Sequence, residues 1–132
     1  MAQERFSNWQ PPVFDERGMT KWMWMCQHRQ NLKLGPLCDI GAFTYINAKE
    51  GVEIGERAQI GSHCSIYSVS TIDEKKGRVV IGKNARVGSH SVIMPGVSIG
   101  ENAVVGAMSF VNADIPAGSV AVGCPARVIK KN

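Results

Sequence analysis

Leucine is scarce in this sequence of 132 residues and is absent after Leu37. Three leucines stand against 25 isoleucines and valines. Long helices normally rely on leucine, whereas isoleucine and valine are stiff at χ1 and favour extended backbone. The composition therefore argues against a helical bundle and for a single β domain. The 14 glycines indicate many tight turns between the strands.

Long apolar runs are missing too. No stretch approaches the roughly 18 consecutive apolar residues of a membrane-spanning helix. The first 30 residues also lack the basic and apolar regions of a secretory signal. We therefore expect a cytoplasmic protein that contacts no membrane. The net charge of +4 suits a phosphorylated small-molecule ligand, and the absence of a nucleic-acid-binding motif argues against a nucleic-acid partner.

Cysteine occurs only four times, without the paired spacing of a metal site or the density of a disulfide framework. The positions are 26, 38, 64 and 124. We expect reduced thiols and no bound metal ion.

A period of six residues organises the chain from Leu34 onwards. Thirteen aliphatic residues recur in this phase, and eight of them are followed directly by glycine. They are Leu34, Ile40, Ile46, Ile54, Ile60, Ile66, Ile72, Ile81, Val87, Ile93, Ile99, Val105 and Val111. Neither an α-helix nor a long flat strand has this period. Each hexad should be a short strand and a corner, with three hexads per triangular coil and coils stacked about 4.8 Å apart.

Extra residues interrupt the phase twice. Two are inserted between Ile46 and Ile54, and three between Ile72 and Ile81. Both insertions should bulge from corners, because the inward positions of stacked coils must stay in register. The second insertion is charged, and loops on repeat scaffolds often line binding faces.

The chain divides into a segment outside the repeat and the repeat itself. We expect residues 1–33 to form an N-terminal cap segment, with a short helix over residues 19–29. Its tryptophans and methionines would cover the open end of the coils, which otherwise exposes an apolar face and strand edges. A lid over a ligand and a partner surface are the alternatives. Residues 34–132 should form the β-helix, with an irregular tail from Ala117.

An ordered set of motifs resembles the hexapeptide-repeat acyltransferases, above all the galactoside and maltose sugar O-acetyltransferases. The resemblance covers about residues 34–130. The motifs are Ile81-Gly82-Lys83-Asn84, Pro95-Gly96-Val97-Ser98-Ile99-Gly100, Val105-Gly106-Ala107 with Ser109, Asp114-Ile115-Pro116 and Gly123-Cys124-Pro125-Ala126-Arg127-Val128-Ile129.

The resemblance implies a left-handed parallel β-helix that assembles as a trimer, with acyl-coenzyme A in the cleft between neighbouring subunits. It implies transfer of an acyl group, typically acetyl from acetyl-CoA, to a hydroxyl or amine of a sugar-like acceptor. A nucleotide-linked sugar of surface polysaccharide synthesis is one such acceptor. By position, Ser89 and Ala107 would offer backbone contacts to the pantetheine arm. Arg127 and Lys130 would approach the phosphates of the coenzyme.

The chain departs from this family in the residue that would act as the catalytic base. The catalytic histidine of the galactoside enzymes falls on Thr71, and their long acceptor loop is mostly missing. Acyl transfer needs a group that takes the acceptor's proton, and histidine is the commonest. His28 lies in the expected cap, which leaves His63 and His90. We predict His63 as the general base, with backbone amides polarising the thioester oxygen, and keep His90 as the alternative.

The hexad count places His90 beside Ser89, against the middle of the pantetheine arm. It places His63 one coil earlier and on a different corner, which in a trimer would face the neighbour's cleft. Side chains of the same region are candidates for acceptor binding: Tyr67, Ser68, Ser70 and Asp73. Ser70 is also a candidate inward residue. Cys64 is not expected to act as a nucleophile, because an inward apolar setting raises the pKa of a thiol.

Two other functions are open to this scaffold. One is a metal enzyme like the γ-class carbonic anhydrases, which hold zinc with three histidines across a subunit interface. The other is a non-catalytic hexapeptide module for assembly, since a fold does not dictate a function.

Overall fold

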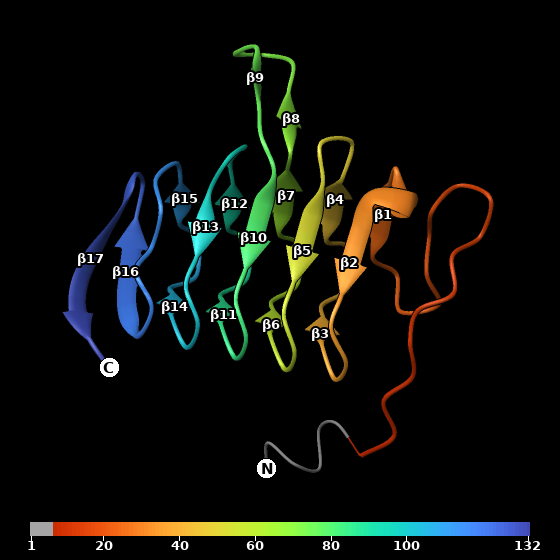
Figure 1. Ribbon diagram of the computed structural model, residues 1–132, viewed down its shortest axis with the longest axis horizontal. Coiled ribbons are helices and arrows are strands. Elements are labelled where there is room, and N and C mark those ends of the chain that lie inside the picture. Colours follow the sequence, from red (N-terminus) through yellow and green to blue (C-terminus); the bar gives the residue numbers. More distant parts are fainter. Residues whose placement is uncertain (1–6) are drawn as a thin grey trace.

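The computed structural model describes residues 7–132, and short strands make up almost all of its regular structure. Three sheets form the faces of one prism (Figure 1). Sheet A contains β1 (Met25–Gln27), β4 (Tyr45–Asn47), β7 (Ser65–Tyr67), β12 (Val92–Ile93) and β15 (Phe110–Val111). Sheet B contains β2 (Leu32–Leu34), β5 (Val52–Ile54), β10 (Val79–Ile81) and β13 (Ser98–Ile99). Sheet C contains β3 (Asp39–Ile40), β6 (Gln59–Ile60), β11 (Arg86–Val87), β14 (Val104–Val105), β16 (Ser119–Gly123) and β17 (Ala126–Lys131).

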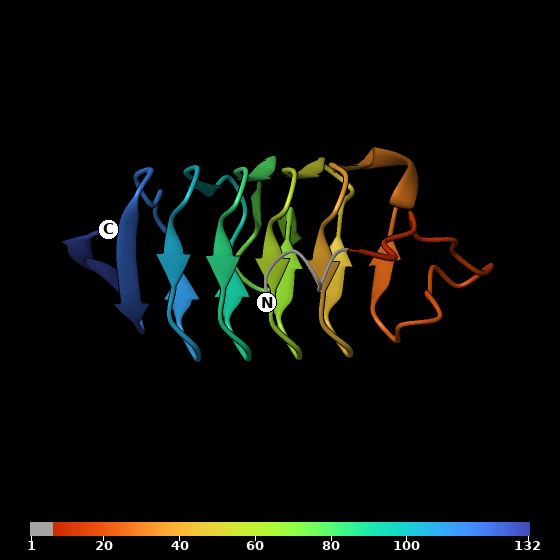
Figure 2. The ribbon, with the colours of Figure 1, turned by 90° about the horizontal axis from the view of Figure 1, so that it is seen from below.

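The coil is left-handed. The strands of sheet B face the viewer and run downward in Figure 1, those of sheet A run upward behind them, and the chain advances from right to left. Figure 2 shows consecutive coils as parallel rungs along the long axis. The predicted left-handed β-helix of hexapeptide repeats is confirmed.

Inward side chains stack in one column per sheet, which is why the sequence repeats aliphatic residues in phase. The columns are Cys26, Ile46, Ile66, Ile93 and Val111 in sheet A, Leu34, Ile54, Ile81 and Ile99 in sheet B, and Ile40, Ile60, Val87, Val105 and Ala121 in sheet C. Eleven of the 13 phased residues are buried. Each fully buried aliphatic side chain contributes roughly 1.5–3 kcal/mol, so this core holds the coils together.

Of the other two phased residues, Leu34 is partly buried, whereas Ile72 has 97% of its surface exposed. It lies at the tip of an antiparallel hairpin of β8 (Val69–Ser70) and β9 (Lys75–Lys76), which projects from the prism (Figure 1). Its assignment to the hexad phase was therefore wrong, as was the inward position of Ser70. Ile66 belongs to sheet A and the next inward residue of the motif, Ile81, belongs to sheet B, so one long insertion leaves the corner between them.

The helix expected over residues 19–29 is also wrong. The first coil begins with β1 at Met25, nine residues before Leu34, where the period of six starts. β1 pairs in parallel with β4 and so covers an edge of sheet A that would otherwise be unpaired. The Met25 N–H donates to the Thr44 carbonyl at 3.0 Å. Trp24 is buried at this end of the core and meets Phe14 edge-on, with ring centroids 5.5 Å apart. The one helical element in residues 7–132 is the 3₁₀ turn η1 (Arg29–Asn31).

The C-terminal tail is regular, contrary to the prediction of an irregular segment. β16 continues sheet C in parallel with β14, and β17 folds back antiparallel to β16. This hairpin pairs the edge that the last coil would otherwise expose. No helix in the described part of the chain is long and apolar enough to span a membrane.

Candidate active site

One corner of the prism, between sheets C and A, repeats the same turn in four successive coils. The four turns, which we call the histidine corner, are Gly41-Ala42-Phe43-Thr44, Gly61-Ser62-His63-Cys64, Gly88-Ser89-His90-Ser91 and Gly106-Ala107-Met108-Ser109. The third residue of each turn has a left-handed backbone, with φ between 57° and 65°. This conformation is uncommon for residues other than glycine. It is supported here by hydrogen bonds between coils, such as the His90 N–H to the Ser62 carbonyl at 3.0 Å.

The first residue of each turn is glycine because neighbouring coils approach too closely for a side chain. A Cβ atom on Gly61 would lie 2.5 Å from the Ser89 nitrogen. A Cβ on Gly88 would lie 2.4 Å from the Ala107 nitrogen. Backbone contacts this short cannot be relieved by a side-chain rotation, so these glycines set the spacing of the corner.

His63 and His90 stack directly on each other in this corner. Their ring centroids are 4.7 Å apart and the planes differ by 4°. Phe43 packs on the other face of His63, with centroids 5.1 Å apart. The expectation that His63 and His90 lie on different corners was therefore wrong. Both histidines are exposed, so both are accessible to a ligand that lies along the corner.

Ser62 orients the His63 ring, a contact that the sequence analysis did not identify. The Nδ1 atom of His63 lies 3.1 Å from the Ser62 hydroxyl oxygen. When Nδ1–H donates to that oxygen, the Nε2 lone pair is free to accept a proton. Cys64 follows in the chain, but burial raises the pKa of its thiol, and Sγ donates to the Gly88 carbonyl at 3.3 Å. This thiol is protonated and unsuited to nucleophilic attack, as predicted.

Three of the four predicted coenzyme-contact residues lie along the same corner. Ser89 and Ala107 occupy consecutive turns, as their spacing of 18 residues predicts. The next coil after Ala107 places the Val122 side chain against Gly106. Arg127 of β17 pairs with Val122, so the row of corner residues continues to Arg127. Lys130 pairs with Val120, three residues further along β17, and lies away from the corner. Both basic side chains are exposed.

The residues suggested for acceptor binding lie elsewhere on the chain. Tyr67 ends β7, whereas His63 precedes it, so the two are at opposite ends of one strand. Ser68 is fully buried, and its hydroxyl donates to the Asn47 carbonyl at 2.7 Å, which leaves it no contact with a ligand. Ser70 and Asp73 hydrogen-bond each other in the β8–β9 hairpin. Within a single chain, these groups do not converge on His63.

Metal ligation also requires converging side chains. Across residues 7–132, no three histidine, cysteine, aspartate or glutamate side chains group as metal ligands. Within a single chain, this corner offers exposed imidazoles beside a line of backbone groups. That arrangement provides a base and a row of backbone groups along which an extended ligand can lie.

Comparison with known proteins relates this geometry to one family model. Residues 78–113 match the family described as bacterial transferase hexapeptide (six repeats). The bifunctional protein GlmU of Rubrobacter xylanophilus is 37% identical over 101 residues, which make up 76% of this chain and 20% of that protein. The chain thus spans about a fifth of the length of this curated relative.

The solved structures that share the fold include two acetyltransferases. A hexapeptide-repeat acetyltransferase of Vibrio cholerae, complexed with acetyl-coenzyme A, has a TM-score of 0.77 at 26% identity, over 82% of this chain and 64% of that one. A maltose O-acetyltransferase of Clostridium difficile has a TM-score of 0.71 at 33% identity, over 82% of this chain and 63% of that one. These matches confirm the resemblance to the hexapeptide-repeat acyltransferases.

Proposed function

We propose that this hexapeptide-repeat chain, which resembles the bacterial acetyltransferases, transfers an acetyl group from acetyl-CoA to a hydroxyl or amine of a sugar-like acceptor. The observation that carries the proposal is the histidine corner. It places an exposed imidazole, His63, beside a line of turns that leads to Arg127. Free sugars and the nucleotide-linked sugars of surface polysaccharide synthesis are both acceptors within this class. The four free cysteines suit a cytoplasmic location.

The donor fits the corner by its shape and charge. The pantetheine arm of coenzyme A is long, thin and carries amides, so a line of backbone groups spaced by the coils matches it. We place the arm along Ala107, Ser89 and Ser62, with the thioester towards His63. The phosphates would then lie near Arg127, whose guanidinium can form charge-assisted hydrogen bonds with them.

The chemistry assigned to the chain is general base catalysis. His63 accepts the proton of the acceptor hydroxyl or amine at Nε2 while Ser62 holds Nδ1–H. The acceptor oxygen or nitrogen then bonds to the acetyl carbonyl carbon. The bond from this carbon to sulfur breaks, and the proton leaves with the coenzyme A thiol. Backbone N–H groups of the corner are suited to stabilise the negative charge on the carbonyl oxygen.

A second copy of the chain would complete the site. Phe43 and Met108 flank the two histidines and are 59% and 75% exposed, which leaves apolar surface next to the base. The β8–β9 hairpin carries the exposed Ile72 away from its own prism. We propose a trimer in which the histidine corner of one subunit faces its neighbour, so that acceptor groups come from the neighbouring chain.

Arg127 should matter more for coenzyme binding than Lys130. We expect Arg127→Ala to weaken acetyl-CoA binding about 10- to 150-fold, since loss of a charge-assisted contact costs roughly 1.5–3 kcal/mol. Lys130→Ala should weaken it by no more than about threefold, because Lys130 lies away from the corner. Calorimetric titration with acetyl-CoA measures both effects.

Acetyl-pantetheine is the control ligand for this prediction, because it lacks the nucleotide and its phosphates. Its affinity should be the same for the unmodified chain and for Arg127→Ala. Equal losses of acetyl-pantetheine and acetyl-CoA would contradict a phosphate role for Arg127. No binding of acetyl-CoA by the unmodified chain would overturn the proposed function.

A further inference from the structure

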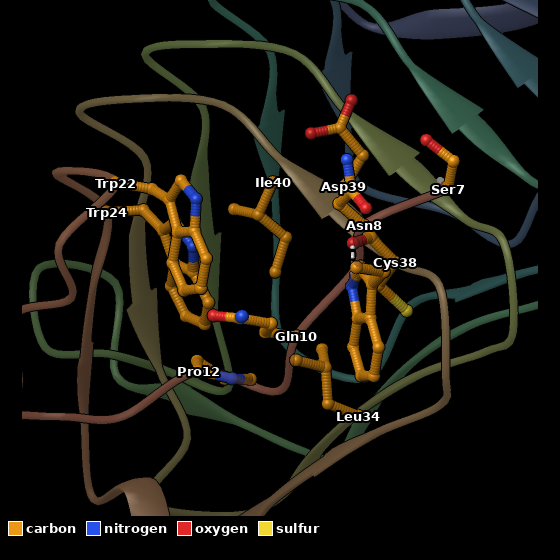
Figure 3. A pocket seen from close by; sticks show the side chains of 11 residues that line it. Ser7, Asn8, Gln10, Pro12, Trp22, Trp24, Leu34, Cys38, Asp39 and Ile40 are labelled. Atoms are coloured by element: carbon orange, nitrogen blue, oxygen red, sulfur yellow. Dashed lines mark hydrogen bonds between the residues drawn. The ribbon is translucent and has the colours of Figure 1, made fainter. Parts of the chain in front are cut away.

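All three tryptophans of the sequence line one pocket at the N-terminal end of the prism. Trp22 and Trp24 form one wall, and Leu34 and Ile40 add apolar surface (Figure 3). Trp9 also lines the pocket. The pocket has a volume of about 250 Å³. Sites for drug-sized ligands have roughly 300–1,000 Å³, so this pocket suits a single ring-sized group.

The polar groups of the pocket are amides and a carboxylate. Asn8, Gln10 and Asp39 line it, and the Gln10 amide points towards the two tryptophans in Figure 3. The Gln10 oxygen accepts a hydrogen bond from Lys21 Nζ at 3.2 Å, so its NH₂ group is the part left to donate. No lysine, arginine or histidine of residues 7–132 is among the lining residues. Such a lining favours a neutral ligand with hydroxyl groups over a phosphorylated one.

Contacts within the protein fix Trp9 and Trp24 in place without a ligand. Trp9 Nε1 donates to the Cys38 carbonyl at 2.7 Å, and Trp24 is buried against Phe14. Burial raises the pKa of the Cys38 thiol to about 11, so the thiol is not a reactive group of the pocket. Trp22 leaves 39% of its surface exposed. Lys21 Nζ lies over the Trp22 ring at 4.8 Å from its centroid, and the part of the Trp22 ring left exposed is the aromatic surface open to a ligand.

The pocket adjoins the histidine corner. Met23 lies between the two tryptophans of the wall, and its carbonyl accepts a hydrogen bond from the Phe43 N–H at 2.8 Å. The Phe43 ring packs in turn on His63. Because coils are spaced by about 4.8 Å, two coils separate the pocket wall from the base by roughly 10 Å. A ligand of two or more sugar rings spans that distance, whereas one ring does not.

We propose that this pocket binds one neutral pyranose unit and anchors the unreacting end of an oligosaccharide acceptor. The C–H faces of a pyranose pack on aromatic rings, and its hydroxyls hydrogen-bond to amides and carboxylates. Binding of the sugar is independent of catalysis. Its role as part of the acceptor rests on the proposed function.

Intrinsic tryptophan fluorescence tests the binding directly, because every tryptophan of the chain lines this pocket. The probes are neutral disaccharides (maltose, lactose, cellobiose and N,N′-diacetylchitobiose), with thymidine diphosphate as the charged comparison. We expect a saturable emission change with at least one disaccharide. Trp22→Ala should weaken that sugar about tenfold and Trp22→Phe less. Trp9 and Trp24 still report the binding in both variants.

Two control variants separate this pocket from the catalytic site. Val13→Ala removes an exposed apolar side chain of the same segment outside the pocket, and should bind the sugar as the unmodified chain does. His63→Ala should also keep the sugar affinity. In transfer assays, Trp22→Ala should raise KM for the oligosaccharide about tenfold and leave KM for acetyl-CoA unchanged.

The outcomes that would overturn the proposal are distinct from failure of the proposed function. No saturable change with any disaccharide, equal binding by Trp22→Ala, or a response to thymidine diphosphate alone would each refute a sugar pocket. If sugars bind but the chain does not bind acetyl-CoA, the pocket stands and its acceptor role is refuted.

Discussion

Replacing His63 by alanine should lower kcat for acetyl transfer by about 10²- to 10⁴-fold, the usual contribution of a positioned base. The imidazole is the only group of its turn that can accept a proton, because Ser62 is a neutral hydroxyl and burial keeps the Cys64 thiol protonated. Acetyl-CoA affinity should remain within about threefold, since the arm is assigned to the backbone of the corner. Thiol release from acetyl-CoA, with maltose, a galactoside and glucosamine as acceptors, measures the rate.

His90→Ala is the matched control for this substitution. Both histidines have left-handed backbones, with φ of 57° and 61°, so both variants impose the same strain on the turn. His90→Ala removes the stacked ring but not the base, and should lower kcat about tenfold at most. Full activity of His63→Ala, or a large loss confined to His90→Ala, would contradict the assignment of His63.

Gly88→Ala should reduce the free energy of unfolding by about 3 kcal/mol, at the upper end of what overpacking usually costs. The new Cβ would lie 2.4 Å from the nitrogen and 2.6 Å from the Cα of Ala107. Both are backbone atoms of the next coil, so relief requires the coils to separate at the corner. The same separation should weaken acetyl-CoA binding, because Ser89 and Ala107 move apart. Urea unfolding followed by circular dichroism, at one protein concentration, measures the stability.

Gly106→Ala is the control at the equivalent position one coil later. There the added Cβ meets Cγ1 of Val122 at 2.5 Å, which is the end of a side chain that can rotate. We expect a cost of about 1 kcal/mol, that of an unfavourable rotamer. Equal destabilisation by the two substitutions would show that close approach of the backbones does not set the spacing of the corner.

The period of six predicted the core correctly, and a single residue, Ile72, caused the misassignment of one corner. Inward aliphatic residues are determined by local chemistry, so the columns through Ile46, Ile54 and Ile60 follow from the period alone. Ile72 has the same chemistry and the same phase but lies on a hairpin. Counting it as an inward residue shifts every later hexad by one face of the prism. That shift is why His63 and His90 were expected on different corners.

The two ends of the stack depend on long-range pairing, which the period does not encode. Trp24 and Met25 fit a helical pattern as well as a strand, and the unpaired edge of β4 decides between them. The tail after Ala117 lacks the hexad but pairs with itself as β16 and β17. One signal for the shared corner was present in the sequence. Gly-Ser-His occurs at Gly61 and again at Gly88, and identical turns indicate equivalent places in a repeat.

A crystal structure of the chain with acetyl-CoA bound tests the role of the histidine corner most directly. The quantity to measure is the distance from the acetyl carbonyl carbon to Nε2 of His63 and of His90. We expect the pantetheine arm along Ala107, Ser89 and Ser62, the phosphates at Arg127, and His63 as the imidazole nearer the thioester, with room for an acceptor atom between them. A thioester nearer to His90, or coenzyme A bound away from the histidine corner, would contradict this expectation.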